Sequence, residues 1–561
     1  MAEETVTEET GKIARAAGVV GFFTLLSRIA GLLRDIIVGY LFGSQGAADA
    51  FFVAFRIPNL LRRLTAEGAL TVAFVPVFTN YLAKEGKAEA AKVAHVVFTF
   101  VALVLAAITL LGILFAEPIA RFFAPGFLDD PRKFSLTVHL TRLMFPYIFF
   151  VSLVALSMGV LNAVRHFMAP ALSPVLFNVC IVVCATLLAR VLSEPVLSLA
   201  YGVLLGGMAQ LALQLPYLSR YGFAPAPNFH FGHPALRRLA FLMGPAVFGA
   251  AVHQINILVS TILASLLPAG SVSYLYYADR LLEFPVGVFA IALGTAALPS
   301  FSFLLAKGDT AGLRSAVVHS LKLVNFISLP ATFGLIAVAV PVFAILFQRG
   351  AFDAVTTVNT AQALVYYAFG LWGISGAKLL APVFYAMEDM KTPVRIAFLS
   401  FLLNLLLSLV FMGPVTVDAS SSSILAAITA ELSARLNVLS LRHAGLALAT
   451  AVSSTFNFLA LLVVLHHRLN GLPLGEVAAS FARNLLNALL MALPLFWIAG
   501  NIDWVGPQRN LYQLSSVFVA LVALGVMLYL VFSRLLGSPE WPFVRQLIAS
   551  LAGRIRNLKI R

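Results

Sequence analysis

The sequence predicts an all-α integral membrane protein of about 14 transmembrane helices, in two pseudo-symmetric six-helix lobes plus two C-terminal helices. Of its 561 residues, 60% are hydrophobic and only 11% are charged, with a mean hydropathy of +0.95. A soluble domain of that composition could not keep its surface in water. Apolar segments of spanning length also follow one another along almost the whole chain, and part of the sequence repeats at a fixed offset.

The apolar segments are each long enough to cross a bilayer as a helix. They lie at 16–42, 50–81, 93–116, 137–161, 171–190, 195–217, 239–267, 271–304, 316–345, 361–386, 394–413, 444–465, 477–499 and 511–536. The acidic stretch 1–12 lacks the basic region and cleavage site of a signal peptide, so we expect the first helix to stay in the mature protein.

The distribution of basic residues predicts the orientation in the membrane. If the N-terminus is cytoplasmic and the helices alternate, the cytoplasmic segments hold more than twice as many Lys and Arg as the opposite side. This bias matches the positive-inside rule, so we expect both termini in the cytoplasm. The basic C-terminal tail is suited to contact anionic lipid headgroups. Without a soluble domain to carry it, a nucleic-acid partner is not expected.

An internal repeat supports the two lobes. The motif PVFTNYLAK at 76–84 recurs as PSFSFLLAK at 299–307, and Ala163 recurs at the same offset as Ala386. An even number of helices between copies keeps them in one orientation, and such duplicated bundles place the substrate site between halves that rock. The predicted parts are the N-lobe (1–217), a cytoplasmic linker (218–238), the C-lobe (239–466, with an outward insertion at 414–443), and the last two helices with a basic cytoplasmic tail (467–561).

The first apolar segment carries charges at membrane depth. A charged side chain there costs roughly 2.5–3.5 kcal/mol, so such residues are rarely lipid-facing. At about 100° per residue, Arg28 and Asp35 share one helical face, with Arg34 beside them. These charges predict the wall of a polar cavity, in which we expect Asp35 to pair with an arginine of the first two segments and to position it.

The second segment is more heavily charged. By the same count Asp49, Arg56, Arg63 and Glu67 share a face, but Pro58 interrupts the helix. Counting therefore leaves open whether the cavity residue is Arg63 or its neighbour in the sequence. Together the two segments predict a net-positive cavity for an anionic substrate.

The second half has its own charges in SVSYLYYADRLLEF at 271–284. Asp279, Arg280 and Glu283 lie within about one helical turn of each other. They form either a helix-end salt bridge or, with Arg280 facing the cavity, the counterpart of the Arg56 region.

Other motifs carry no chemistry of their own. Cys180 and Cys184 lie in an apolar helix and are interpreted as packing residues rather than as a disulfide or a metal site. No GxxxxGK[ST], HExxH or GxGxxG motif is present, so no cofactor, metal or ATP is expected. In the insertion, the sequence DASSSS is suited to cap a short amphipathic helix.

Five stretches carry a resemblance to a known family. They are SRIAGLLRDIIVGYLFG at 27–43, DAFFVAFRIPNLLRRLTAEGALTVAFVPVF at 49–78, SVSYLYYADRLLEFP at 271–285, LGTAALPS at 293–300 and KLLAPVFYAMEDMKTPV at 378–394. They closely resemble the MurJ (MviN) family of bacterial lipid II flippases, within the multidrug/oligosaccharidyl-lipid/polysaccharide exporter superfamily. The insertion at 414–443 departs from that family.

The resemblance implies a non-enzymatic transporter in the bacterial cytoplasmic (inner) membrane. It implies that undecaprenyl-pyrophosphoryl disaccharide-pentapeptide moves from the inner to the outer leaflet for peptidoglycan synthesis. The expected partners are lipid II and membrane lipids, with other cell-wall synthesis proteins as further candidates. Guanidinium groups suit the diphosphate because they bind phosphate oxygens in pairs.

The resemblance also implies the cavity residues. Matched to this sequence they are Ser27, Arg28, Arg34, Asp35, Asp49, Arg62, Glu67 and Arg280. Our interpretation of the charges adds Arg56. The resemblance favours Arg62 where helical counting favours Arg63.

Two other functions are considered. A drug or cation exporter of the same superfamily would prefer an acidic cavity, whereas this one is rich in arginine. A membrane glycosyltransferase acting on the same lipid would need an acid/base pair on a large outward loop. Only 117–135 and 414–443 offer room, and neither holds such a pair.

Overall fold

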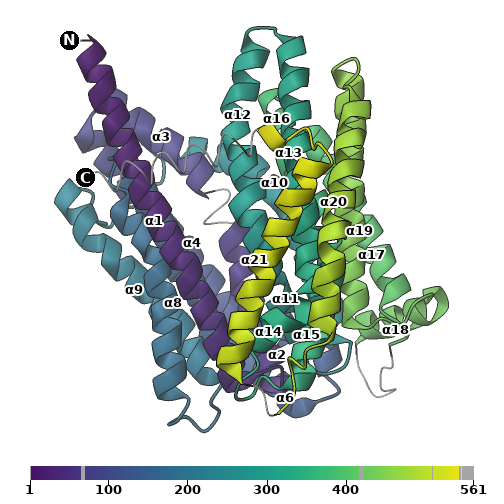
Figure 1. Ribbon diagram of the computed structural model, residues 1–561. Coiled ribbons are helices and arrows are strands. Elements are labelled where there is room, and N and C mark those ends of the chain that lie inside the picture. The colour runs from purple at the N-terminus through teal and green to yellow at the C-terminus, as the bar shows by residue number, and fades with distance from the viewer. Residues whose placement is uncertain (1, 65–69, 416–422, 508–509, 543–544, 546–561) are drawn as a thin grey trace. The chain divides into compact units, whose positions relative to one another are not determined.

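The computed structural model describes residues 2–64, 70–415, 423–507, 510–542 and 545, and within them the chain is helical with no strand (Figure 1). The helices are α1 (Ala2–Phe42), α2 (Gly46–Leu64), α3 (Thr71–Lys84), α4 (Lys87–Leu114), α5 (Ala116–Phe123), η2 (Pro125–Phe127), α6 (Pro131–Met144), α7 (Tyr147–Ala163), α8 (Met168–Leu188), α9 (Leu197–Tyr221), α10 (Pro234–Ser265), α11 (Ser271–Pro285), η3 (Val286–Ala290), α12 (Ile291–Ala306), α13 (Thr310–Ala337), α14 (Ala339–Leu346), α15 (Ala354–Ala368), α16 (Leu371–Ala386), α17 (Lys391–Phe411), α18 (Ile424–Leu436), α19 (His443–Arg468), α20 (Leu474–Gly500) and α21 (Leu511–Leu535). The all-α membrane fold predicted from composition is confirmed.

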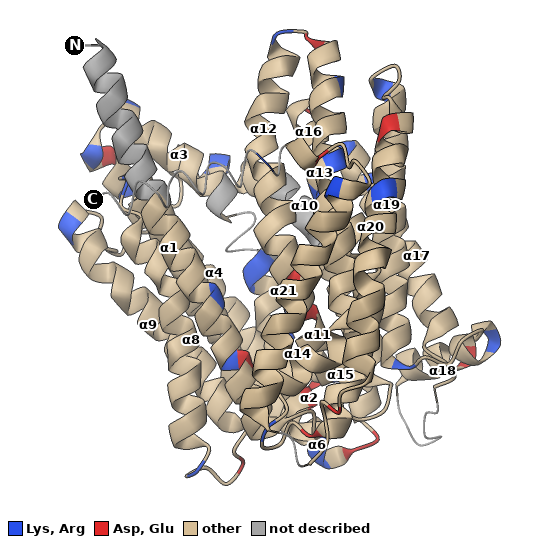
Figure 2. Cartoon of the chain, viewed as in Figure 1, with Lys and Arg blue, Asp and Glu red and all other residues tan. Residues whose placement is uncertain are grey.

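Within the described residues the predicted segments fall on helices, but the predicted number of spans is not confirmed. Among the described residues, ten helices are long and apolar enough to cross a membrane, or eleven if the pair α15–α16, bent by 47°, is one span. The predicted segment 50–81 shows why the numbers differ. It holds the 19-residue, arginine-rich α2 and the 14-residue α3, neither of which is a long apolar helix. Figure 2 shows the charged positions mostly near helix ends, with apolar stretches between them.

The repeat that relates Pro76 to Pro299 recurs in the helix boundaries. The pairs α4 and α13, α5 and α14, and α8 and α17 each begin and end at positions related by that same offset. The two copies therefore share not only a few identical residues but also the lengths and breaks of their helices.

Two turns repeat the same geometry at that offset. Arg165, after α7, and Glu388, after α16, both have a positive φ, 61° and 60°. In both turns the next residue's N–H donates to a carbonyl five residues earlier, which closes the helix as a Schellman motif. At the same offset, the carboxylates of Asp130 and Asp353 cap α6 and α15 by accepting from backbone N–H groups.

By packing, the chain forms two compact units. Unit 1 comprises residues 1–273, 349–352 and 415–430, and unit 2 comprises residues 274–348, 353–414 and 431–561. The helix α10 corresponds to α1 in the repeat, yet it packs on α2 and α3 of unit 1. The repeat and the packing therefore divide the chain at different places.

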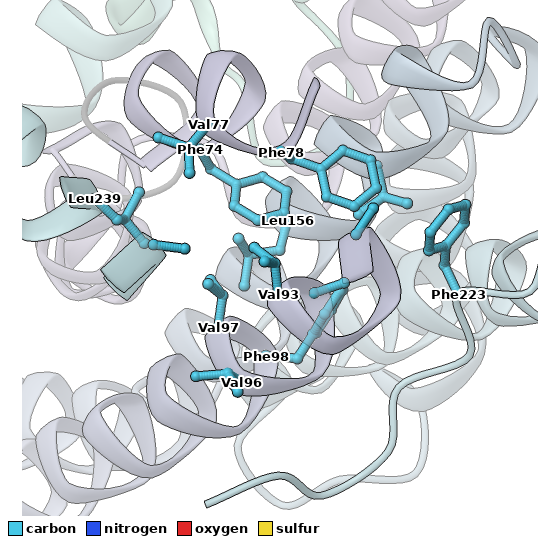
Figure 3. Close-up of a cluster of buried hydrophobic side chains, with 14 of the residues drawn as sticks. Phe74, Val77, Phe78, Val93, Val96, Val97, Phe98, Leu156, Phe223 and Leu239 are labelled. Atoms are coloured by element: carbon cyan, nitrogen blue, oxygen red, sulfur yellow. The ribbon is translucent and has the colours of Figure 1, made fainter. Parts of the chain in front are cut away.

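Within unit 1, an apolar cluster joins α3, α4 and α7 to the start of α10. It includes the buried side chains of Phe74, Phe78, Val93, Leu156 and Leu239 (Figure 3). Phe78 lies edge-on against Phe223, with 5.3 Å between ring centroids, so the segment after α9 is held against this core.

Within unit 2, a buried polar network joins α20 to the turn after α21. The hydroxyl of Ser480 donates to Oε1 of Glu540 at 2.6 Å, and Asn484 donates to Oε2 at 3.2 Å. The Tyr529 hydroxyl donates to the Phe326 carbonyl of α13 at 2.7 Å. These bonds satisfy polar groups that would otherwise be costly among apolar helices.

Small residues allow close helix contacts in both units. A Cβ atom on Gly202 of α9 would lie 2.7 Å from the Cα atom of Ile181 on α8, and one on Gly373 of α16 would lie 2.5 Å from the Cα of Thr455 on α19. Lipid chains are as apolar as the helix surfaces, so the hydrophobic effect does not drive helices together in a membrane. Close van der Waals packing of the backbones does so instead.

We predict that Gly202→Ala lowers the melting temperature of the purified protein, because overpacking a helix contact costs about 1–3 kcal/mol. The control is Gly475→Ala on α20, where an added Cβ meets nothing within 4 Å. Equal melting temperatures for the two variants would contradict the close contact.

Candidate functional site

One part of the predicted site joins α1 to α8. Nε and one Nη of Arg34 donate to Oδ1 of Asp35 at 3.0 and 2.7 Å, and the other Nη donates to Oδ1 of Asn178 at 3.0 Å. The side chains of Arg34 and Asp35 are only 13% and 5% exposed. The prediction that Asp35 pairs with an arginine of the opening helices is confirmed.

Ser27 and Arg28 lie earlier on α1. The amide of Asn178 donates to the Ser27 carbonyl at 3.4 Å, and also to the Pro174 carbonyl of its own helix at 3.0 Å. Asn178 of α8 thereby contacts α1 at two positions, Ser27 and Arg34. Arg28 itself is exposed.

Asp49 of α2 has a different environment. Its Oδ1 accepts from the N–H and hydroxyl of Ser273 at 3.0 and 2.6 Å, and its Oδ2 accepts from the Gly270 N–H at 2.8 Å. These donors belong to the first turn of α11 and the residue before it, where backbone N–H groups lack helical partners. Lys133 of α6 adds an ion pair at 3.0 Å. Asp49, 1% exposed, is therefore a capping carboxylate with four donors.

Two further arginines of α2 each donate to a neutral oxygen. Arg56 donates to the hydroxyl of Thr261 on α10, and Nε of Arg62 donates to Oδ1 of Asn59 at 2.9 Å. Both guanidinium groups, like that of Arg63, are half-buried.

Two predicted site residues do not belong to the described part of unit 1. Glu67 is outside the described residues. Arg280 belongs to unit 2, where it donates to Glu283 at 2.8 Å and stacks 4.9 Å above the Tyr276 ring. The helix-end salt bridge considered from the sequence is therefore present, with the Arg280 side chain still 25% exposed.

Three residues of this site were missed by sequence reasoning: Asn178, Thr261 and Lys133. Asn178 could have been identified from the sequence, because it is an amide in the mostly apolar helix predicted at 171–190. Thr261 and Lys133 could not have been identified in this way, because their partners Arg56 and Asp49 are distant in the sequence.

The arrangement is suited to bind an anion. Guanidinium groups lie along α1 and α2, where an ion is poorly screened by water, and several of their partners are neutral oxygens that a stronger anionic acceptor can replace. Among the described residues no cluster of three or more His, Cys, Asp or Glu side chains could hold a metal ion.

The duplicated helical fold is one that solved membrane transporters share. In fold the chain is similar to an inward-facing multidrug resistance MATE family transporter, with a TM-score of 0.64 and 14% identity over 79% of this chain and 94% of that one.

Closer similarities identify the family. Residues 38–433 match the family model described as lipid II flippase MurJ. The chain is 36% identical to lipid II flippase MurJ of Burkholderia cenocepacia, over 92% of this chain and 96% of that protein. It is 34% identical to a probable lipid II flippase MurJ of Vibrio cholerae, over 96% and 98% of the two chains. A solved structure of lipid II flippase MurJ in an inward closed conformation covers 94% of this chain and 99% of its own, with a TM-score of 0.73 and 26% identity. The chain belongs to the MurJ family.

We predict that Lys133→Met destabilises the protein strongly, because removing one member of a buried ion pair typically costs about 3–5 kcal/mol. Lys133→Met should cost less in an Asp49→Asn background than in the natural protein, because the negative charge that Lys133 pairs with is then already absent. Thermal unfolding of the two single variants and the double variant in one detergent measures this coupling. If Lys133→Met lowers stability equally in both backgrounds, the Lys133 charge does not act through Asp49.

Proposed function

We propose that this chain is a lipid II flippase that works by alternating access and is not an enzyme. It moves undecaprenyl-pyrophosphoryl disaccharide-pentapeptide from the inner to the outer leaflet of the bacterial cytoplasmic membrane. Family membership and the relatives named lipid II flippase support the substrate. The single observation that carries the proposal is the guanidinium of Arg34, held among apolar helices by Asp35 and Asn178.

The chemistry of Arg34 fits a diphosphate. A guanidinium binds phosphate oxygens through two parallel N–H donors, and the interaction is stronger where water is scarce. One nitrogen of Arg34 is bound to the neutral amide oxygen of Asn178, which is a weaker acceptor for a guanidinium than a phosphate oxygen is. Asp35 holds the side chain in one orientation while the site is empty.

The proposed orientation places both termini in the cytoplasm, as the distribution of basic residues indicates. Arg56 and Arg62 of α2, and Arg280 of α11, are the further candidate phosphate ligands. Proteins that make or consume lipid II are candidate partners, because substrate must be loaded on one side and removed on the other.

We predict that Arg34→Ala and Arg280→Ala each abolish growth of cells depleted of their own lipid II flippase, while both proteins still reach the membrane in normal amounts. Arg34→Lys should rescue only in part, because lysine lacks the guanidinium fork. The control is Arg121→Ala on α5, which removes an exposed pair with Glu117. Normal growth of both site variants would contradict the assignment.

We also predict that Asp35→Asn is milder than Arg34→Ala. The amide oxygen of asparagine can still accept the two hydrogen bonds that position the guanidinium. Growth at matched expression across a series of induction levels gives the ranking. A more severe defect in Asp35→Asn would instead indicate that the carboxylate titrates during transport.

A further inference from the structure

The insertion between α17 and α19 contains a helix that the transport site does not use. α18 runs from Ile424 to Leu436, a length of 13 residues. Its first turn is capped by Ser423, whose hydroxyl accepts from the N–H of Ala426 at 3.3 Å. The short capped helix predicted from the sequence is confirmed.

Buried residues line one side of the helix. Ala426, Thr429 and Ser433 form this buried face, at the i, i+3, i+7 spacing of one helical side. Glu431 and Arg435 form an exposed ion pair at 2.6 Å that borders Ile428.

A further face is apolar and exposed. It consists of Leu425, Ile428, Leu432 and Leu436, which are 37%, 50%, 40% and 36% exposed. A helix with one face against its own protein needs polar residues on the rest to remain in water. A continuous leucine and isoleucine stripe of one helix length therefore requires an apolar neighbour.

The chain after α18 shows what that neighbour is. The N–H groups of Val438 and Leu439 donate to the Val410 carbonyl at 3.0 and 3.3 Å, at the last turn of α17. Both side chains are exposed, and Leu402 and Leu406 form an exposed apolar stripe along α17, a membrane span. Within unit 2, exposed apolar side chains therefore continue from α17 through Val438 and Leu439 to Leu436 and Leu432 at the C-terminal end of α18.

We propose that α18 is an interfacial helix that lies in the plane of the bilayer surface at the C-terminal end of α17. Its apolar stripe is buried at the boundary between headgroups and acyl chains, and the Glu431–Arg435 pair faces water. The occupant of the exposed face is thus lipid, not a second protein. The helix fixes the depth at which α17 and α19 leave the membrane, and this inference does not depend on which substrate is carried.

The test measures lipid exposure along α18 in the full chain, reconstituted in phosphatidylethanolamine and phosphatidylglycerol vesicles. Cysteines carrying nitroxide labels are placed singly at Ile428 and Leu432, and at the matched control positions Ala427 and Ala434, in a variant lacking Cys180 and Cys184. Collision rates with oxygen, which concentrates in lipid, and with a water-soluble nickel chelate are compared.

We expect Ile428 and Leu432 to have at least several-fold higher oxygen-to-nickel ratios than Ala427 and Ala434. Equal ratios, or nickel access at all four positions, would overturn the proposal and leave a protein partner as the occupant. A second measurement keeps the native cysteines, with benzoylphenylalanine in place of Leu432 or Ala434. Photo-crosslinking to phospholipid from 432 but not from 434 supports the proposal, and its absence at 432 overturns it.

Discussion

A polar or charged group carried among apolar membrane helices must be bound by another group of the protein, and this constraint organises the structure. The Asp49 carboxylate is held by four donors at the start of α11 and on α6. The Glu540 carboxylate is bound between Ser480 and Asn484. Both carboxylates tie separate helices together, because a group that cannot reach water is satisfied only where the helices meet correctly.

The same constraint separates structural charges from those available to a substrate. Asp49 is enclosed by donors that belong to the fold. Arg34 and Arg56, in contrast, contact an amide and a hydroxyl, which bind a guanidinium less strongly than phosphate does. Asp35 positions Arg34 without enclosing it. An anion can bind these guanidinium groups in place of the amide and hydroxyl oxygens. Such binding replaces neutral hydrogen bonds by charge-assisted ones and does not require the helices to repack.

Much of the fold was predictable because it rests on composition and local patterns. Within the described residues the predicted apolar segments fall on helices, and the repeat inferred from a handful of identities recurs at both ends of three helix pairs. The number of 14 spans stays a prediction, since hydropathy alone does not reveal features such as the 47° bend between α15 and α16. The site was predicted as residue types rather than as contacts. The pairing of Asp35 with Arg34 is local and was foreseen, whereas the donors to Asp49 lie 84 to 224 residues away and no helical count could supply them.

The central claim is that this chain carries lipid II across the membrane. The most direct measurement depletes the protein from its own cell and follows both the total amount of lipid II and the fraction open to an externally added enzyme that cleaves its headgroup. The account predicts that lipid II accumulates while the externally cleavable fraction falls towards zero before growth stops. Accumulation of lipid II that remains fully cleavable from outside would contradict it, because the defect would then lie after the transfer between leaflets.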